Sequence, residues 1–111
     1  MKFEGTPGEW VADIRGGCAA IYPKERTNDT PGCHRDDERN IAYSSKGSNY
    51  DEVAGHWSLD PSVEHDFRLM AAAPELLEAL QDALHAYDKH GEHSEWDFAR
   101  SAIAKAIGKE E

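Results

Sequence analysis

Three arginines and three aromatic residues stand in or beside segments that the sequence predicts to be ordered. A guanidinium group holds a phosphate through paired hydrogen bonds, and a flat aromatic ring stacks against a nucleobase. Together, these residue types could form a binding site for an anionic nucleotide. The candidate residues are Arg15, Arg39, Arg68, Trp10, Tyr43 and Trp57.

A simpler interpretation of the same residues stays open. The aromatic residues could form the core of a small sheet, and the arginines could pair with surface carboxylates. Two further arginines, Arg26 and Arg35, lie in a long polar loop, where binding a ligand would cost conformational entropy. That loop could still close over a bound ligand.

The sequence offers little for catalysis or metal binding, so we predict a protein that is not an enzyme and has no cofactor. Cys33 and His34 are adjacent, whereas a nucleophile and its base normally converge from separate segments. Zinc could be held by Cys18, Cys33, His34 and His56, but their spacing matches no standard zinc site. We expect both cysteines to be reduced thiols, as in a cytosolic protein.

The charge of the chain argues against direct binding of nucleic acid. The sequence has 12 Lys and Arg against 22 Asp and Glu, a net charge of -10, whereas contact with a phosphate backbone needs a basic face. The acidic residues are scattered apart from short clusters such as 36–38. This pattern favours a soluble acidic domain over a surface that mimics nucleic acid.

The 111 residues correspond in length to one domain, 1–111, with a β-rich half at 9–58 and a helical half at 60–108. No apolar run approaches the roughly 18 residues of a membrane-spanning helix. The opening stretch, MKFEGTPGEW, lacks the apolar region of a secretory leader. We therefore expect a cytoplasmic protein with no membrane partner.

The first half of the chain carries the alternating pattern of half-buried strands. EWVADIR at 9–15 and CAAIYP at 18–23 flank Gly16 and Gly17, which predicts a hairpin with positive φ at the turn. ERNIAYSS at 38–45 predicts a third strand, and HWSL at 56–59 predicts a short fourth. The stretch between them, 46–55, is interpreted as a turn.

The second half changes to helical spacing at Asp60, which is a candidate N-cap, followed by Pro61 at the first helical position. We expect two or three helices, at 61–72, 74–89 and 94–108, after an antiparallel sheet of three or four strands. Val63, Phe67 and Met70 would share one helix face. The sequence thus predicts an α+β fold.

The string RLMAAAPELLEAL at 68–80 places a proline inside a helical pattern. Pro74 lacks the N–H that would bond to Met70, and it disfavours helical geometry at Ala73. Glu75 would then suit the positive end of a new helix dipole. The string therefore predicts a helix–break–helix junction.

The same string resembles a motif of small, uncharacterised accessory proteins of tailed phages and prophages, close to ARLIAAAPELLEAL. TPGEW at Thr6–Trp10 and DERNIAYSS at Asp37–Ser45 also resemble this group, so the resemblance spans roughly residues 6–107. The group has Asn-Ala before Arg-Leu where this chain has Asp66 and Phe67, so the helix is expected to pack differently here.

Small phage accessory proteins are often counter-defence factors, and the predicted layout is similar to the Thoeris anti-defence sponges. That likeness implies a homo-oligomer in the bacterial cytoplasm that sequesters a cyclic nucleotide signal in pockets between subunits. Two alternatives stay open: an acidic inhibitor of a host defence complex, similar to an anti-CRISPR, and a ligand-free oligomeric accessory protein. Self-association would use Leu76, Leu77, Leu80, Leu84, Trp96, Ile103 and Ile107.

Overall fold

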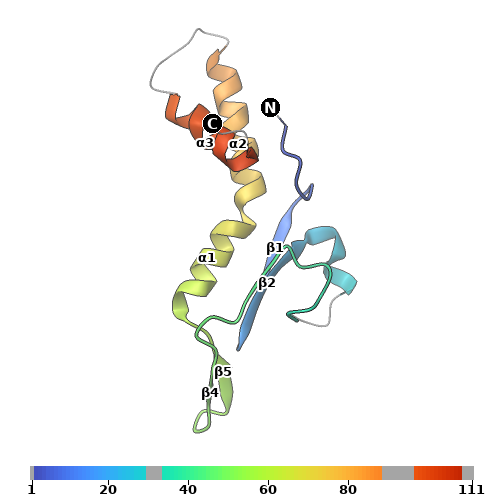
Figure 1. Ribbon diagram of the computed structural model, residues 1–111, viewed down its shortest axis with the longest axis vertical. Helices are drawn as coiled ribbons and strands as arrows, with labels where there is room; N and C mark the ends of the chain where they lie inside the picture. Colours follow the sequence, from blue (N-terminus) through green and yellow to red (C-terminus); the bar gives the residue numbers. More distant parts are fainter. Residues whose placement is uncertain (1, 30–33, 89–96, 109–111) are drawn as a thin grey trace. The chain divides into compact units, whose positions relative to one another are not determined.

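The computed structural model describes residues 2–29, 34–88 and 97–108 (Figure 1). It divides into two compact units, which we describe separately. The sheet unit is Thr6–Ala72, and the helical unit is Met1–Gly5 together with Ala73–Glu111. Cys33, Trp96 and the predicted start of the last helix at Ser94 lie outside the described residues.

The sheet unit begins with an antiparallel sheet in the order β1-β2-β3. The strands are β1 (Trp10–Arg15), β2 (Cys18–Pro23) and β3 (Ala42–Ser44). Arg15 pairs with Cys18, so Gly16 and Gly17 form the predicted turn. Neither glycine has a positive φ, so that part of the prediction is wrong. A small residue is needed at both positions for another reason: Trp57 packs closely against them.

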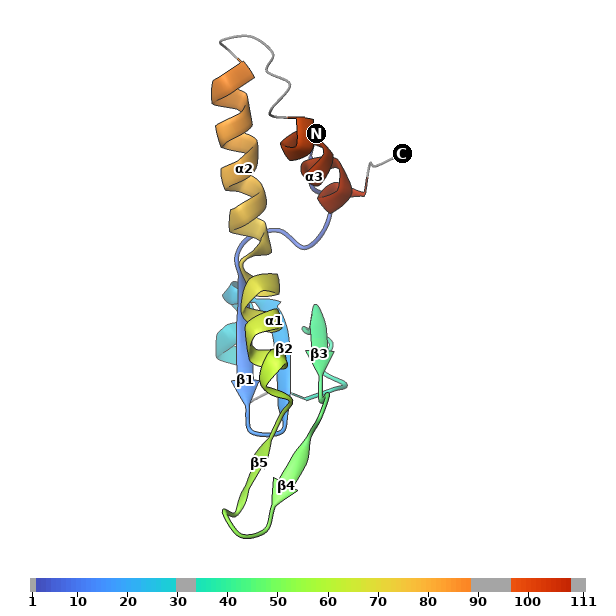
Figure 2. The same ribbon diagram turned by 90° about the vertical axis from the view of Figure 1, so that its left-hand side faces the viewer.

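Two short elements lie outside this sheet. A 3-10 helix, η1 (Lys24–Asp29), follows β2 within the predicted long loop. A second antiparallel sheet pairs β4 (Asn49–Asp51) with β5 (His56–Ser58). The stretch interpreted as a turn therefore contains a strand, and the predicted fourth strand pairs with it. Both views show this hairpin projecting beyond the turn that joins β1 and β2 (Figures 1 and 2).

Helix α1 (Pro61–Ala71) lies over β1 and β2 on one face of the three-stranded sheet (Figure 2). Asp60 is its N-cap and accepts a hydrogen bond from Ser62 N at 2.9 Å, as the sequence predicted. Val63 and Phe67 are buried, whereas Met70 is exposed. The core consists of Val63 and Phe67 packed on Ala19, Ile21 and the partly buried Trp10, Ala12, Ile14, Ile41, Ala42 and Leu59.

The helical unit contains α2 (Ala73–Asp88) and α3 (Asp97–Ile107), which pack against each other. Ala99 and Ile103 are its buried apolar residues on α3. Ala72 separates α1 from α2, and Pro74 stands in the first turn of α2, so the predicted junction is confirmed. The break falls at Ala72, and Ala73, where we expected non-helical geometry, is the first residue of α2, so that part of the prediction is wrong.

The predicted α+β fold is confirmed, with an antiparallel sheet first and helices after it. The boundary between the two units falls between Ala72 and Ala73, so α1 belongs with the sheets and α2 and α3 form the other unit. Of the helices in the described residues, none is both long and apolar enough to cross a bilayer.

Candidate functional site

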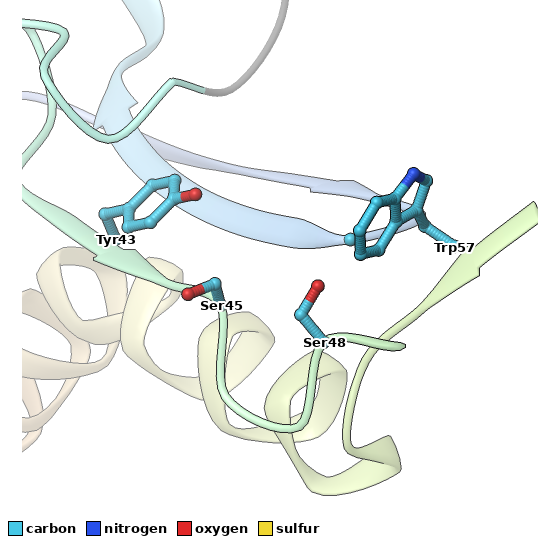
Figure 3. Close-up of a pocket in the computed structure, with 5 residues that line it drawn as sticks. Tyr43, Ser45, Ser48 and Trp57 are labelled. Carbon is cyan, nitrogen blue, oxygen red and sulfur yellow. The ribbon is translucent and has the colours of Figure 1, made fainter. Parts of the chain in front are cut away.

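The sheet unit carries an open pocket of about 310 Å³. Its lining residues come from the β1–β2 turn, from β3 and the turn that follows it, and from β5. Tyr43 and Trp57 stand at opposite ends, with Ser45 and Ser48 between them (Figure 3). Gly17 completes the lining. The pocket therefore combines two aromatic rings with aliphatic hydroxyl groups.

Strand register sets the side on which the pocket forms. Ala19 and Ile21 belong to the core beneath α1, while Tyr43 pairs with Ala20, whose side chain points to the other face. We call this second face the pocket face. Ser45 follows Tyr43 by two residues and so shares its side of the sheet.

The turn that presents Ser45 and Ser48 is fixed against the start of α1. Ser48 N donates to Ser45 O at 3.0 Å, and Asp60 N donates to Lys46 O at 3.1 Å. Gly47 has a φ of 69°, and a Cβ atom there would lie 2.9 Å from Asp60 N. Glycine is thus required at this position for two reasons, namely its positive φ and its close approach to the N-cap residue Asp60.

Trp57 reaches the pocket from the β4–β5 hairpin. Its ring lies 5.4 Å, centroid to centroid, from that of Tyr50, its cross-strand partner. Trp57 also lies against the two turn glycines. A Cβ atom on Gly16 would lie 2.9 Å from Trp57 O, and one on Gly17 would lie 3.3 Å from Trp57 Cβ. The side chain of Trp57 remains 54% exposed, so it offers an accessible aromatic face.

A charged pair lies on the same face, across the sheet from Tyr43. Arg15 Nε donates to Asp13 Oδ1 at 3.0 Å, and Tyr22 Oη donates to Asp13 Oδ2 at 3.0 Å. The hydrogen bond to Asp13 raises the pKa of Arg15. Burial is the main cause that raises the pKa of Tyr22, and its hydrogen bond to Asp13 raises that pKa further. Arg15 itself is exposed, whereas the Asp13 carboxylate is largely covered.

Arg39 is held in a different kind of contact. Its Nε donates to Asp37 Oδ1 at 2.8 Å, its Nη2 bonds to Asp37 Oδ2, and its backbone N donates to Asp37 Oδ1 at 2.9 Å. These bonds hold the pKa of Asp37 far below its usual range. Arg39 does not line the pocket, and its side chain is only 8% exposed. The pair fastens the segment that leads into β3.

Of the other candidates, Arg68 and Trp10 lie away from the pocket. Arg68 Nη2 bonds to Glu64 Oε1 at 2.9 Å along α1. Trp10 packs on the core, and its Nε1 donates to Thr6 O at 3.1 Å. The structure thus brings Tyr43 and Trp57 together at the pocket and places Arg15 on the same face. The three arginines pair with carboxylates, as the simpler interpretation anticipated.

Sequence reasoning missed Ser45, Ser48 and Gly17 as lining residues. A signal was available in SKGS at 45–48, where a glycine between serines favours a tight turn that exposes both hydroxyl groups. The contact of Trp57 with the β1–β2 turn had no such signal, because it joins segments about forty residues apart.

The cysteine prediction needs a correction. Cys18 is disulfide-bonded, so the expectation of a reduced thiol there is wrong. A cysteine in a disulfide has no thiolate to offer a metal ion. Within residues 2–29, 34–88 and 97–108, no three His, Cys, Asp or Glu side chains gather where they could hold one.

The fold and the pocket define a small α+β protein with an aromatic-walled surface site. The chain belongs to the family described as Salmonella phage P22 protein Y8K6, which it matches over residues 1–110. It is therefore a phage protein, as the sequence resemblance implied. No curated protein and no solved structure matches the chain.

Proposed function

We propose that this phage protein binds a cyclic nucleotide signal of the host's immunity and sequesters it without catalysis. The observation that carries the proposal is the pocket, in which Tyr43 and Trp57 flank Ser45 and Ser48. We further propose that it acts as a homo-oligomer in the bacterial cytoplasm, a reducing compartment in which the disulfide of Cys18 would have to persist.

The chemistry of the lining suits a nucleobase. Stacking of a base on an aromatic side chain contributes about 1–3 kcal/mol. The hydroxyl groups of Ser45 and Ser48 both donate and accept hydrogen bonds, so they fit the mixed donors and acceptors of a base edge. A volume of about 310 Å³ has the size of a small-ligand site.

Arg15 is the best placed of the candidate arginines to hold a phosphate. It pairs with Cys18 on β2, and Ser45 continues the same cross-strand row on the β3 side. Arg15 and Ser45, the outer members of this row, are two strand spacings apart, roughly 10 Å between their Cα atoms. The long arginine side chain can reach across part of this distance. Because Arg15 is exposed, its guanidinium can reorient from Asp13 toward an anion.

Sequestration fits this lining better than catalysis. The described residues around the pocket include two serines but neither a histidine nor a carboxylate that could activate them. The net charge of -10 disfavours a nucleic acid chain, whose many phosphates would all face an acidic surface. A small nucleotide with few phosphates needs only a local cation.

Calorimetric titration with cyclic dinucleotides, cyclic trinucleotides and cyclic ADP-ribose isomers tests the proposal. We expect heat from at least one, and we expect Trp57→Ala to weaken that binding. Arg15→Ala should weaken it by roughly 1.5–3 kcal/mol, the worth of a charge-assisted hydrogen bond. Arg68→Ala is the matched control, because it is also an exposed arginine paired with a carboxylate on its own element.

No heat from any of these compounds would overturn the proposal. It would favour the alternative of an acidic inhibitor that acts on a host defence complex. Equal losses in Arg15→Ala and Arg68→Ala would reject the assignment of Arg15 and point to an effect of net charge alone. The mass of any small molecule released on denaturing the protein, purified from cells with an active defence system, would identify the signal.

A further inference from the structure

The β4–β5 hairpin is exposed along its whole length. Every residue from Ser45 to Ser58 is exposed, including the apolar Tyr50, Val53 and Trp57. Val53 is 99% exposed, and the Tyr50 side chain is 47% exposed. An isolated two-stranded hairpin gains little stability in water, so a hairpin that leaves about half of Tyr50 and Trp57 and almost all of Val53 exposed is unlike a purely structural element.

Tyr50 and Trp57 form a preformed pair on one side of this hairpin. They are directly opposite in the register, with ring centroids 5.4 Å apart and planes inclined by 53°. Rings held in this way present an electron-rich face that attracts a cation. Because the two rings already contact each other across the strands, less side-chain entropy is lost on binding than for two separate rings.

The hairpin itself carries carboxylates and no lysine or arginine, while Lys46 stands at its base beside Asp60. From Gly47 to Asp66 the sequence contains five carboxylates and no lysine or arginine. Two of the carboxylates, Asp51 and Glu52, stand at the end of the hairpin itself. Asp51 Oδ1 accepts hydrogen bonds from Val53 N at 2.9 Å and Ala54 N at 3.0 Å, which shapes the turn.

We infer that the β4–β5 hairpin is a docking surface for a basic segment of a partner protein. Arginine or lysine side chains of the partner would lie over the rings of Tyr50 and Trp57, and Glu52 would pair with a neighbouring cation. Charge complementarity selects this occupant, because a nucleic acid would be repelled here, and so would the equally acidic hairpin of a second copy of this chain. Val53 would supply an apolar contact at the tip.

The test uses the full-length protein and a defined probe, the peptide acetyl-GRGRGRG-amide. Its control is the same peptide with glutamine in place of each arginine. Amide NMR spectra recorded during titration should shift at residues 49–58 with the arginine peptide and stay unchanged with the glutamine peptide. Tyr50→Ala should weaken binding about two- to fivefold, the range of an exposed cation–π contact.

A matched pair of charge variants distinguishes docking at the hairpin from a general electrostatic attraction between the acidic protein and the basic peptide. Glu52→Gln should weaken peptide binding about threefold, as expected for an exposed ion pair. Glu75→Gln removes the same charge from the first turn of α2 and should leave binding unchanged. Equal losses in the two variants, shifts spread over both units, or no shifts at residues 49–58 would each overturn the inference.

The docking inference and the nucleotide proposal can fail independently. Glu52 does not line the pocket and stands outside the Tyr50–Trp57 pair, so Glu52→Gln leaves the nucleotide titration unaffected. Ser48 lines the pocket and lies outside the Tyr50–Trp57 pair. Ser48→Ala should therefore alter nucleotide binding and leave peptide binding as it is.

Discussion

Gly16 lies directly against Trp57: a Cβ atom at Gly16 would come within 2.9 Å of Trp57 O and 3.3 Å of Trp57 Cβ. This contact brings the β4–β5 hairpin against the β1–β2 turn and so sets one end of the pocket. The turn has glycines because a neighbouring strand occupies the space that side chains would need, and its own backbone requires no positive φ.

Substitutions at the two turn glycines should have graded effects on Trp57. Gly16→Ala places a methyl group against a backbone oxygen, which cannot move without displacing β5. Gly17→Ala meets Ser48 Oγ and Trp57 Cβ at 3.3 Å, which need to shift by only a few tenths of an ångström. We therefore expect larger changes in the Trp57 indole NMR signal for Gly16→Ala. Equal or reversed effects would contradict this packing.

The turn after β3 offers a second comparison of glycines. Gly47 and Gly55 both have a positive φ, 69° and 75°, but a Cβ atom meets Asp60 only at Gly47 and open space at Gly55. Gly55→Ala should cost about 1–2 kcal/mol from backbone conformation alone. Gly47→Ala should cost more, as measured by urea unfolding. A smaller loss for Gly47→Ala would show that the turn is not held against α1.

The Asp37–Arg39 pair should make stability depend on pH. The pKa of Asp37 is lower in the folded protein than the value of about 3.9 in an unfolded chain. The ion pair therefore adds stability at neutral pH, and this contribution is lost as the pH falls below about 4. Unfolding at pH 6 and pH 3 should show that Asp37→Asn costs more stability at pH 6.

Asp36 provides the control for this pH effect. It stands next to Asp37 in the sequence and pairs with Arg35, but its side chain is 91% exposed. Asp36→Asn should change stability little at either pH. If the loss in Asp37→Asn were the same at pH 6 and pH 3, its ionisation would not be coupled to folding.

The core between α1 and the sheet should tolerate little truncation. Phe67 is 6% exposed and packs with Ile21 and Val63. Phe67→Ala should lower the free energy of unfolding by about 3–5 kcal/mol. Leu69 lies on the same helix with 65% exposure, so Leu69→Ala should stay within about 0.5 kcal/mol of the unmodified protein. Similar losses in both variants would contradict this placement of the core.

Self-association through the helical unit remains a prediction. Leu76 on α2 is 52% exposed and Phe98 on α3 is 74% exposed, which leaves apolar surface for another copy. Light scattering at micromolar concentration should give an oligomer mass, and Leu76→Ser with Phe98→Ser should reduce it. Val53→Ser, at an exposed position in the sheet unit, should not. A monomer mass throughout would remove both the assembly and any pocket formed between subunits.

The sequence by itself determined most of the secondary structure. Alternation along β1 and β2, the N-cap at Asp60 and the break at Pro74 are local signals, because each depends on neighbours within a few residues. Local signals failed where a segment has no core to face. The sequence around β4 has turn-forming residues and no apolar alternation, and it therefore predicts a turn, whereas the structure has an exposed strand there.

Only the tertiary structure decided which candidate residues meet. Trp10, Tyr43 and Trp57 look alike as aromatic residues of the β-rich half, yet strand register sends Trp10 to the core and Tyr43 to the pocket face. The approach of Trp57 to Gly16 joins segments that no local pattern links. The arginines likewise look equivalent in the sequence. Arg39 and Arg15 each pair with a carboxylate two residues earlier in the chain, yet the Arg39 side chain is covered and the Arg15 side chain is exposed. This difference has no local signal, because burial depends on the packing of the whole unit.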